Sequence, residues 1–140
     1  MSVQADEIRQ WISKGDHDLG TAKITYLHIP EYFDIVTFHC QQAVEKYLKA
    51  YLIFQSTAFR FSHDLIYLLD LITQKDSDFE SYYDTVSELQ GYAVEIRYPS
   101  ETIYLSKENL ENAMKIAKDV REFVTRKMNI TVDYNDILDK

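Results

Sequence analysis

The segment from Tyr32 to Ser56 contains neither glycine nor proline and repeats its apolar residues at helical spacing. One face of this segment is formed by residues three and four positions apart, namely Phe33, Val36, Cys40, Ala43, Tyr47, Ala50 and Phe54. Such spacing predicts an α-helix with one buried side. At about 1.5 Å per residue, the helix runs roughly 37 Å, which is enough to cross a small domain. We therefore expect the other elements to pack around this segment.

Four further helices are predicted from apolar spacing and from residues that favour helix ends. The first covers Gln4–Leu27, and Pro30 both ends it and serves as the first position of the central helix. The later helices are expected to begin at capping residues: Ser62 with the apolar pair Phe61 and Ile66, Ser77 with Glu80, and Ser106 with the apolar pair Leu105 and Leu110. Lys115, Lys118 and Arg121 are expected on the outer side of the last helix.

No segment alternates apolar and polar residues with a period of two, so strands are not expected. The predicted fold is an all-α, antiparallel up-and-down bundle of four to five helices. The bundle is expected to span residues 1–128, followed by an acidic C-terminal tail at 129–140 that is loose or forms one short turn.

The charge of the chain argues against an extended nucleic acid as a partner. The formal net charge is −8. The segment from Asp76 to Glu101 contains seven acidic residues and only one basic residue, Arg97. Binding along a phosphate backbone needs a basic surface. No apolar run is long enough to span a membrane and no signal peptide is visible at the N-terminus, so we expect a cytoplasmic protein without a membrane partner.

The familiar enzyme motifs are absent, and no metal site or cofactor is predicted. Cys40 is the only cysteine and falls on the apolar face of the central helix, where a buried small side chain is the simpler interpretation than a reactive thiol. The four histidines are not spaced three or four residues apart, so no helix carries a local metal site. His63 precedes Asp64 at a helix start, which favours local hydrogen bonding over catalysis.

The polar side of the central helix is the first candidate site. It carries His39, Gln41, Gln42, Glu45, Lys46 and Lys49. Glu45 and Lys49 have the spacing of a solvent-exposed helical ion pair. The same residues could instead line a polar groove that binds a phosphate-bearing ligand, or could form a subunit interface.

Arg97 is the second candidate, with Tyr98 beside it. Arg97 follows a buried helical face, and Tyr98-Pro99 fixes the chain direction after it. An arginine at this place can anchor the helix end through hydrogen bonds, or it can contact a ligand. Its spacing supports both interpretations equally.

Several segments together resemble the HEPN family (higher eukaryotes and prokaryotes nucleotide-binding). They are DHDLGTAK (16–23), FHCQQAVEKYLKAYL (38–52), SHDLIYLL (62–69) and IRYPSE (96–101). The resemblance implies a homodimeric helical bundle, often encoded beside a minimal nucleotidyltransferase in a toxin–antitoxin-like pair. Many relatives are metal-independent ribonucleases with an arginine followed, four to six residues later, by a histidine. By position, the resemblance makes Arg97 the counterpart of that arginine.

The chain departs from the ribonuclease pattern, because no histidine follows Arg97 anywhere in the sequence. The side chain that would act as general acid or base is missing. We therefore expect a non-catalytic dimeric module that binds a nucleotide, a nucleotidyltransferase partner, or both. One alternative is a ribonuclease toxin that combines Arg97 with His39 or His63. Another is a purely structural subunit without a ligand.

Overall fold

The computed structural model describes residues 3–96 and 105–134 of the chain. Within these residues it contains helices and connections but no strand, which confirms the all-α bundle. The elements are α1 (Val3–His28), α2 (Phe33–Phe54), α3 (Leu65–Thr73), a short 3-10 helix η1 (Ser77–Tyr82), α4 (Tyr83–Ile96) and α5 (Lys107–Met128).

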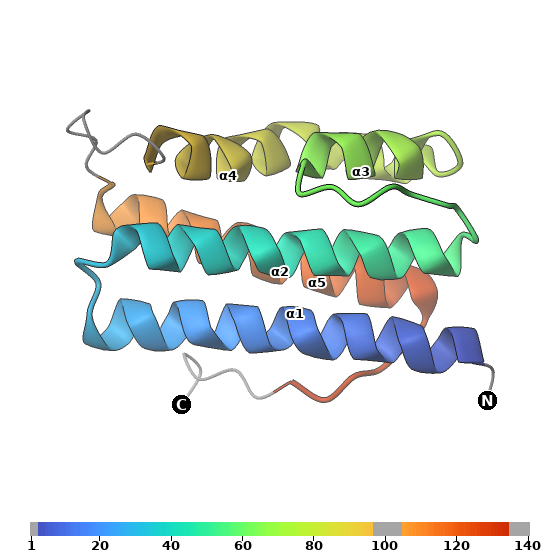
Figure 1. Ribbon diagram of the computed structural model, residues 1–140, viewed down its shortest axis with the longest axis horizontal. Coiled ribbons are helices and arrows are strands. Elements are labelled where there is room, and N and C mark those ends of the chain that lie inside the picture. The colour runs from blue at the N-terminus through green and yellow to red at the C-terminus, as the bar shows by residue number, and fades with distance from the viewer. Residues whose placement is uncertain (1–2, 97–104, 135–140) are drawn as a thin grey trace.

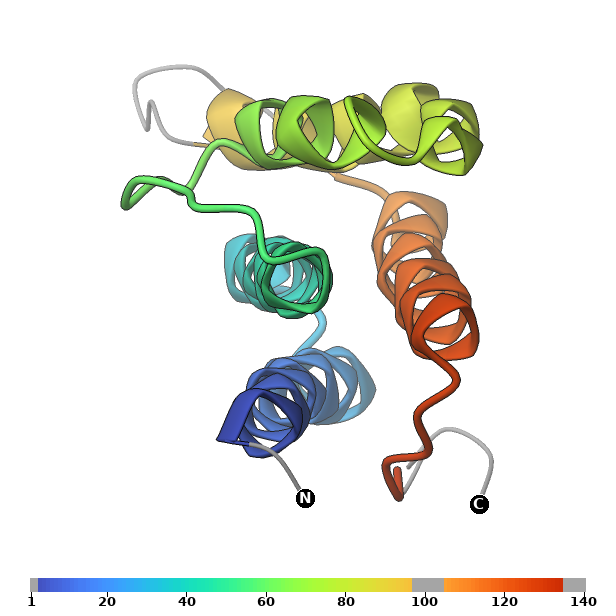
Figure 2. The same cartoon turned by 90° about the vertical axis from the view of Figure 1, so that its right-hand side faces the viewer.

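Helix α2 lies at the centre of the bundle, as its sequence predicts. It is the one helix in the described part of the chain that packs against all four others. Helix α1 runs antiparallel beside it, α5 lies behind both, and α3 and α4 form a layer on the other side of α2 (Figures 1 and 2). The apolar face of α2 is fully buried at Val36, Cys40, Ala43 and Tyr47. Burial of this face against the neighbouring helices contributes to the hydrophobic stabilisation of the bundle.

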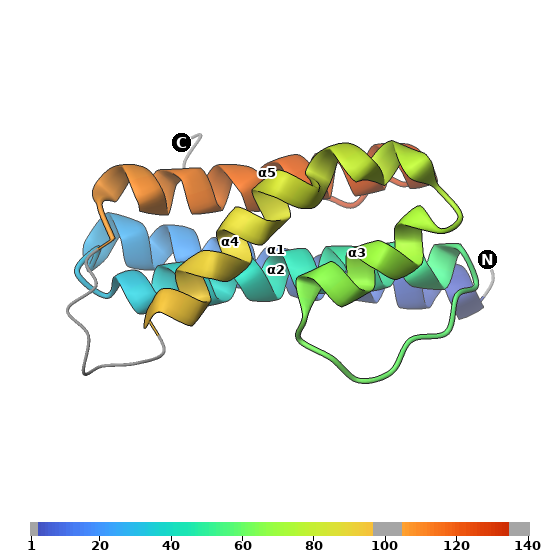
Figure 3. The same ribbon diagram turned by 90° about the horizontal axis from the view of Figure 1, so that it is seen from above.

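The layer of α3, η1 and α4 is joined to the rest of the bundle partly through aromatic side chains. Figure 3 shows α4 crossing obliquely above α2 and α5. The ring of Phe79 in η1 lies 4.5 Å from the ring of Tyr51 in α2 and 4.8 Å from that of Phe123 in α5, measured between centroids. Tyr82 adds a further ring at 4.8 Å from Phe123. Aromatic pairs at these separations stabilise a fold by more than the burial of their surface alone. These four rings therefore help to hold η1 against α2 and α5.

Helix α5 begins where the sequence predicts, and two other helices do not. The side chain of Ser106 accepts a hydrogen bond from the backbone N–H of Asn109, which completes a capping box. Helix α3 is instead capped by Asp64, and the 3-10 helix by Asp76, so the predictions for Ser62 and Ser77 were wrong. Each of these chain segments offers two side-chain acceptors close together, and a carboxylate accepts backbone N–H groups at least as well as a hydroxyl.

Two other local predictions also differ from the structure. Pro30 lies in a turn closed by the backbone hydrogen bond from Tyr32 to Ile29, and α2 starts only at Phe33. The predicted apolar contact between Phe61 and Ile66 does not anchor Phe61 in the core, since 82% of its surface is exposed. The connection that precedes α3 therefore runs over the surface of the bundle (Figure 3).

Candidate functional site

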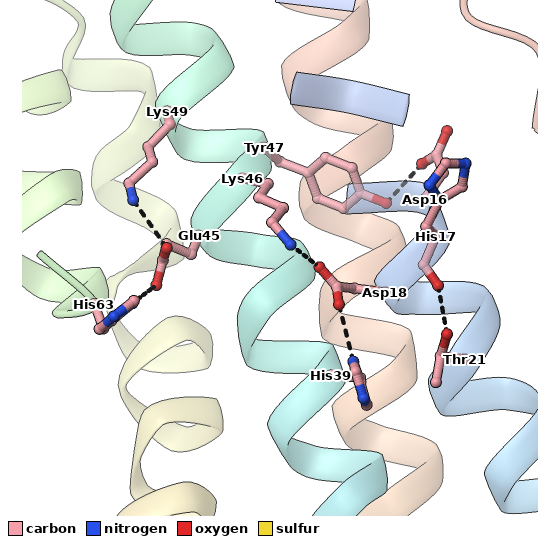
Figure 4. A network of polar contacts seen from close by, with 10 residues as sticks. All are labelled: Asp16, His17, Asp18, Thr21, His39, Glu45, Lys46, Tyr47, Lys49 and His63. Atoms are coloured by element: carbon pink, nitrogen blue, oxygen red, sulfur yellow. Dashed lines mark hydrogen bonds and ion pairs between the residues drawn. The ribbon is translucent and has the colours of Figure 1, made fainter. Parts of the chain in front are cut away.

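The polar residues predicted on α2 divide into two groups that contact different parts of the chain. Figure 4 shows Lys46 directed toward Asp18 of α1, while Glu45 and Lys49 point toward the connection that carries His63. The single polar groove expected from the sequence is therefore two separate clusters on neighbouring sides of one helix. Each cluster has its own carboxylate at the centre.

The first group, which we call the Asp18 cluster, joins α2 to α1. The carboxylate of Asp18 lies 2.9 Å from Nδ1 of His39 through one oxygen and accepts a hydrogen bond from Nζ of Lys46 through the other. The side chains of His39 and Lys46 remain 25% and 22% exposed. Gln42 follows His39 by three residues and precedes Lys46 by four, so it lies on the same side of the helix. The Asp18 cluster is thus partly open to solvent.

The second group, the Glu45 cluster, has a buried ion pair at its centre and an exposed histidine, His63, at its edge. Glu45 accepts a hydrogen bond from Nζ of Lys49 at 2.9 Å and lies 2.8 Å from Nδ1 of His63. Both Glu45 and Lys49 are buried, which contradicts the solvent-exposed ion pair expected from their spacing. The ammonium group of Lys49 lies 5.6 Å from the ring centres of both Trp11 and Phe61. These rings replace water around the cation through cation–π contacts.

Three further residues were predicted at the site, and the structure describes only Gln41 among them. Gln41 lies four residues before Glu45, on the same side of α2, and its Oε1 atom is buried without a hydrogen-bond partner in the described part of the chain. Arg97 and Tyr98 lie outside the described residues, so their role in anchoring the helix end or in contacting a ligand stays a prediction.

A third charged group, which sequence reasoning missed, lies inside the bundle. Asp16 of α1 accepts two hydrogen bonds from Arg121 of α5, at 2.6 Å from Nε and 3.0 Å from Nη2. The hydroxyl of Tyr47 donates to the same carboxylate at 2.7 Å. All three side chains are buried, so the expectation that Arg121 lies on the outer side of α5 was wrong. A planar guanidinium matches a carboxylate with two parallel hydrogen bonds, which is the favourable form of a buried pair.

Burial and charge shift the pKa values within this interior group. Burial, together with the neighbouring charge and hydrogen bond of Asp16, raises the pKa of Tyr47 far above its ordinary value. Burial alone lowers the pKa of Arg121, but the hydrogen bonds and charge of Asp16 outweigh this and raise it. At neutral pH Tyr47 is therefore a neutral phenol and Arg121 a charged guanidinium.

The C-terminal segment packs against the same region. Arg121 donates a hydrogen bond to the carbonyl of Val132 at 2.9 Å, and its guanidinium lies 4.7 Å from the ring centre of Tyr134. Arg9 of α1 donates to the carbonyl of Thr131 at 2.6 Å. The sequence predicts a loose tail or one short turn after residue 128, and residues 129–134 differ from this because the side chains of Arg9 and Arg121 bind their carbonyl groups.

An exposed apolar stripe continues from the Asp18 cluster toward the start of α2. It consists of Tyr32, Ile35 and Phe38, spaced three residues apart and exposed by 53%, 37% and 50%. The ring of Phe38 stands edge-on against that of His39, with 5.1 Å between centroids. No other helix lies between α2 and the viewer in Figure 1, so one side of this helix is uncovered by the rest of the bundle. Exposed apolar groups gathered in this way mark interaction surfaces more often than scattered ones do.

The cysteine at the centre of α2 contributes no reactive group. Cys40 is fully buried, which confirms its interpretation as a small core side chain. Burial raises the pKa of its thiol well above the ordinary value, so the nucleophilic thiolate is not formed near neutral pH.

Other kinds of site find no support in the part of the chain that the structure describes. A mostly apolar hollow of about 320 Å³ lies at one end of the bundle, lined by Pro30, Glu31, Phe33, Leu105, Lys107 and Leu110, and it contains none of the predicted site residues. Over residues 3–96 and 105–134, no set of three or more His, Cys, Asp and Glu side chains is arranged to hold a metal ion. In the same ranges no helix has the length and hydrophobicity to cross a membrane.

The sequence and the fold of the chain were compared with those of known proteins. The model of the HEPN domain matches residues 8–131. The fold is similar to the crystal structure of an archaeal HEPN homologue, with a TM-score of 0.61 and 19% sequence identity over 87% of this chain and 98% of the other. No curated protein sequence matches the chain. The domain match extends over most of the sequence and ends within the C-terminal segment that packs on α1 and α5. The chain therefore belongs to the HEPN domain family.

Proposed function

We propose that this chain is a non-catalytic binding module that pairs with a second copy of itself and binds a nucleotide-type ligand at the Asp18 cluster. The observation that carries the proposal is the convergence of two partly exposed donors, His39 and Lys46, on one carboxylate. A partner nucleotidyltransferase, as the family resemblance implies, would occupy the same open side of α2.

The hydrogen-bonding capacity of the Asp18 cluster supports a single phosphate group as the ligand. An ammonium group has three donors, and the contact with Asp18 uses one of those on Lys46. The Nε2 atom of His39 makes no hydrogen bond within the described residues, and Gln42 lies between His39 and Lys46 along the helix. Asp18 offsets the positive charge of Lys46, so the cluster suits one small anion rather than a long polyanion.

The Asp18–His39 contact also favours a second candidate, a metal-independent ribonuclease with His39 as the base. A carboxylate bound at Nδ1 orients an imidazole and leaves Nε2 to accept a proton, as in other acid–base sites. Against this stands the sequence, in which no histidine follows Arg97. The binding module requires fewer assumptions, because it needs only the donors already in place.

Titration calorimetry with ATP, GTP and a short single-stranded RNA tests the proposal. We expect binding of a nucleotide to the unchanged chain and its loss in Lys46→Ala, because Lys46 supplies the exposed charge. Lys115→Ala is the matched control, since Lys115 is also a lysine paired with an aspartate, Asp119, but on α5. It should bind as the unchanged chain does. The absence of heat with all three ligands would rule out the ligand half of the proposal.

Incubation of the same RNA with purified protein separates the two candidates. The binding module leaves the RNA intact. Cleavage without added metal that disappears in His39→Ala would instead establish the ribonuclease and overturn the non-catalytic assignment.

A further inference from the structure

An exposed aromatic ring stands beside the Glu45 cluster. Phe61 lies in the connection between α2 and α3, with 82% of its surface in solvent. Its ring stands edge-on to that of His63, with 4.9 Å between centroids, and Nζ of Lys49 lies 5.6 Å from its centre. These contacts hold the ring in place although most of its surface is exposed. The connection therefore presents a flat apolar group to solvent in a defined position.

The side chains that hold Phe61 are themselves positioned by buried charges. Glu45 and Lys49 are both buried, and Glu45 lies 2.8 Å from Nδ1 of His63. A carboxylate at Nδ1 fixes the orientation of an imidazole ring. Trp11 of α1 lies as close to Nζ of Lys49 as Phe61 does, at 5.6 Å from its ring centre. Two aromatic residues from different parts of the chain thus meet at one buried cation.

The Asp18 cluster lies on the same side of α1 as Trp11. The two residues are seven positions apart, which is about two helical turns or about 10.5 Å along the axis. On α2 the corresponding residues, Lys46 and Lys49, leave neighbouring turns of the helix (Figure 4). Lys14, which is exposed, lies between Trp11 and Asp18 on that side of α1. One nucleotide is long enough to reach from the cluster to the aromatic rings.

We propose that the base of the bound nucleotide stacks on Phe61 while its phosphate is held at the Asp18 cluster. Aromatic side chains bind unpaired bases by stacking, with little dependence on which base is present. The exposed charge of Lys14 adds to the attraction for the phosphate. This inference rests on the binding function proposed above and adds the place where the base is recognised. The ligand is a free mononucleotide or the unpaired end of an RNA strand, since both carry the same phosphate and base.

The fluorescence of Trp11 reports on this place directly, because it is the only tryptophan of the chain. Titrations with AMP and with ribose 5-phosphate compare the same phosphate with and without a base. We expect AMP to quench the emission of Trp11 and ribose 5-phosphate to leave it unchanged. Calorimetry should give AMP an affinity about tenfold higher, since stacking of one base on an aromatic side chain contributes on this order.

Substitutions at Phe61 separate stacking from other roles of the ring. Phe61→Leu keeps an apolar side chain but removes the flat ring, so it should lower the affinity for AMP about tenfold, to that for ribose 5-phosphate. Phe61→Trp should retain the preference for AMP. Phe54→Leu is the matched control, since Phe54 is also an exposed aromatic residue but lies nine residues after Glu45, on the opposite side of α2. It should bind AMP as the unchanged chain does.

A short single-stranded RNA with a 5′-phosphate distinguishes the two sources of the ligand. Tighter binding of this RNA than of AMP, with the same loss in Phe61→Leu, identifies an RNA end, and equal or weaker binding identifies a free mononucleotide. Either result supports stacking on Phe61. Circular dichroism of each variant confirms that it is folded.

Two results would overturn the inference. They are equal affinities of the unchanged chain for AMP and ribose 5-phosphate, and an affinity for AMP that does not change in Phe61→Leu. The phosphate site fails separately, because Lys46→Ala should weaken both ligands and leave the preference for the base to Phe61. If Lys46→Ala changes neither affinity while Phe61→Leu removes the preference for AMP, the Asp18 cluster is not the phosphate site and the stacking on Phe61 stands. Binding of neither ligand would rule out the proposed function and this inference together.

Discussion

Replacement of Asp16 by alanine is expected to lower the free energy of unfolding by about 3–5 kcal/mol, the usual loss when one member of a buried ion pair is removed. The substitution leaves the guanidinium of Arg121 buried without a counter-charge and the hydroxyl of Tyr47 without an acceptor. Asp16→Asn should cost less, because its amide oxygen can still accept one of these hydrogen bonds. Urea denaturation followed by circular dichroism, at one fixed protein concentration, measures the difference.

An exposed ion pair provides the matched control for this prediction. Asp119 pairs with Lys115 on the surface of α5, where both side chains are largely exposed. Asp119→Ala should leave the free energy of unfolding almost unchanged, since exposed pairs contribute little. Replacing both members of the interior pair, as in Asp16→Ala with Arg121→Met, should recover part of the loss because no charge is left buried alone. If Asp16→Ala costs no more than Asp119→Ala, the interior group does not stabilise the fold in the way described.

Substitution of two glycines in α1 is expected to change stability in opposite directions. A Cβ atom at Gly15 would lie 2.6 Å from Cε1 of Tyr47, closer than such atoms approach, whereas a Cβ at Gly20 meets nothing within 4 Å. Alanine replaces glycine in a helix with a gain of about 0.5–1 kcal/mol. Gly20→Ala should show that gain. Overpacking at Gly15 costs about 1–3 kcal/mol and exceeds it, so Gly15→Ala should lower the free energy of unfolding.

The ring of Tyr47 cannot easily move aside, because it is fully buried and its hydroxyl is held by Asp16. Gly15→Ala combined with Tyr47→Leu should therefore cost less than the sum of the two single changes, since the smaller side chain removes the clash. Thermal denaturation of the four variants gives both comparisons. A stabilising effect of Gly15→Ala equal to that of Gly20→Ala would show that the close packing of α1 and α2 at this point is wrong.

The long helices could be predicted from the sequence because apolar residues repeat along them at the spacing of a helix with one buried side. In α2 the spacing of Val36, Cys40 and Ala43 requires no information from the rest of the chain. The start of α3 could not be chosen in the same way, since Ser62 and Asp64 both offer an oxygen to backbone N–H groups. Such choices depend on the direction from which the preceding chain arrives.

The charged side chains show the limit of local patterns more clearly. Glu45 and Lys49 have the same spacing whether they are exposed or buried, and their burial depends on the separate segment that carries Phe61 and His63. Arg121 lies on the buried apolar face of α5, four residues after Ala117 and three before Val124. This spacing indicates that its side chain points into the bundle. Its partner Asp16 lies 105 residues away, and no spacing rule connects them.

The binding function proposed for this HEPN-family chain depends on the Asp18 cluster as the place where a phosphate is held. Calorimetric titration of AMP tests this most directly, when the unchanged chain, Lys46→Ala and the control Lys115→Ala are compared under the same conditions. We predict binding by the unchanged chain and by Lys115→Ala, and its loss in Lys46→Ala, because Lys46 supplies the partly exposed charge of the cluster. Equal binding by all three proteins would contradict the account.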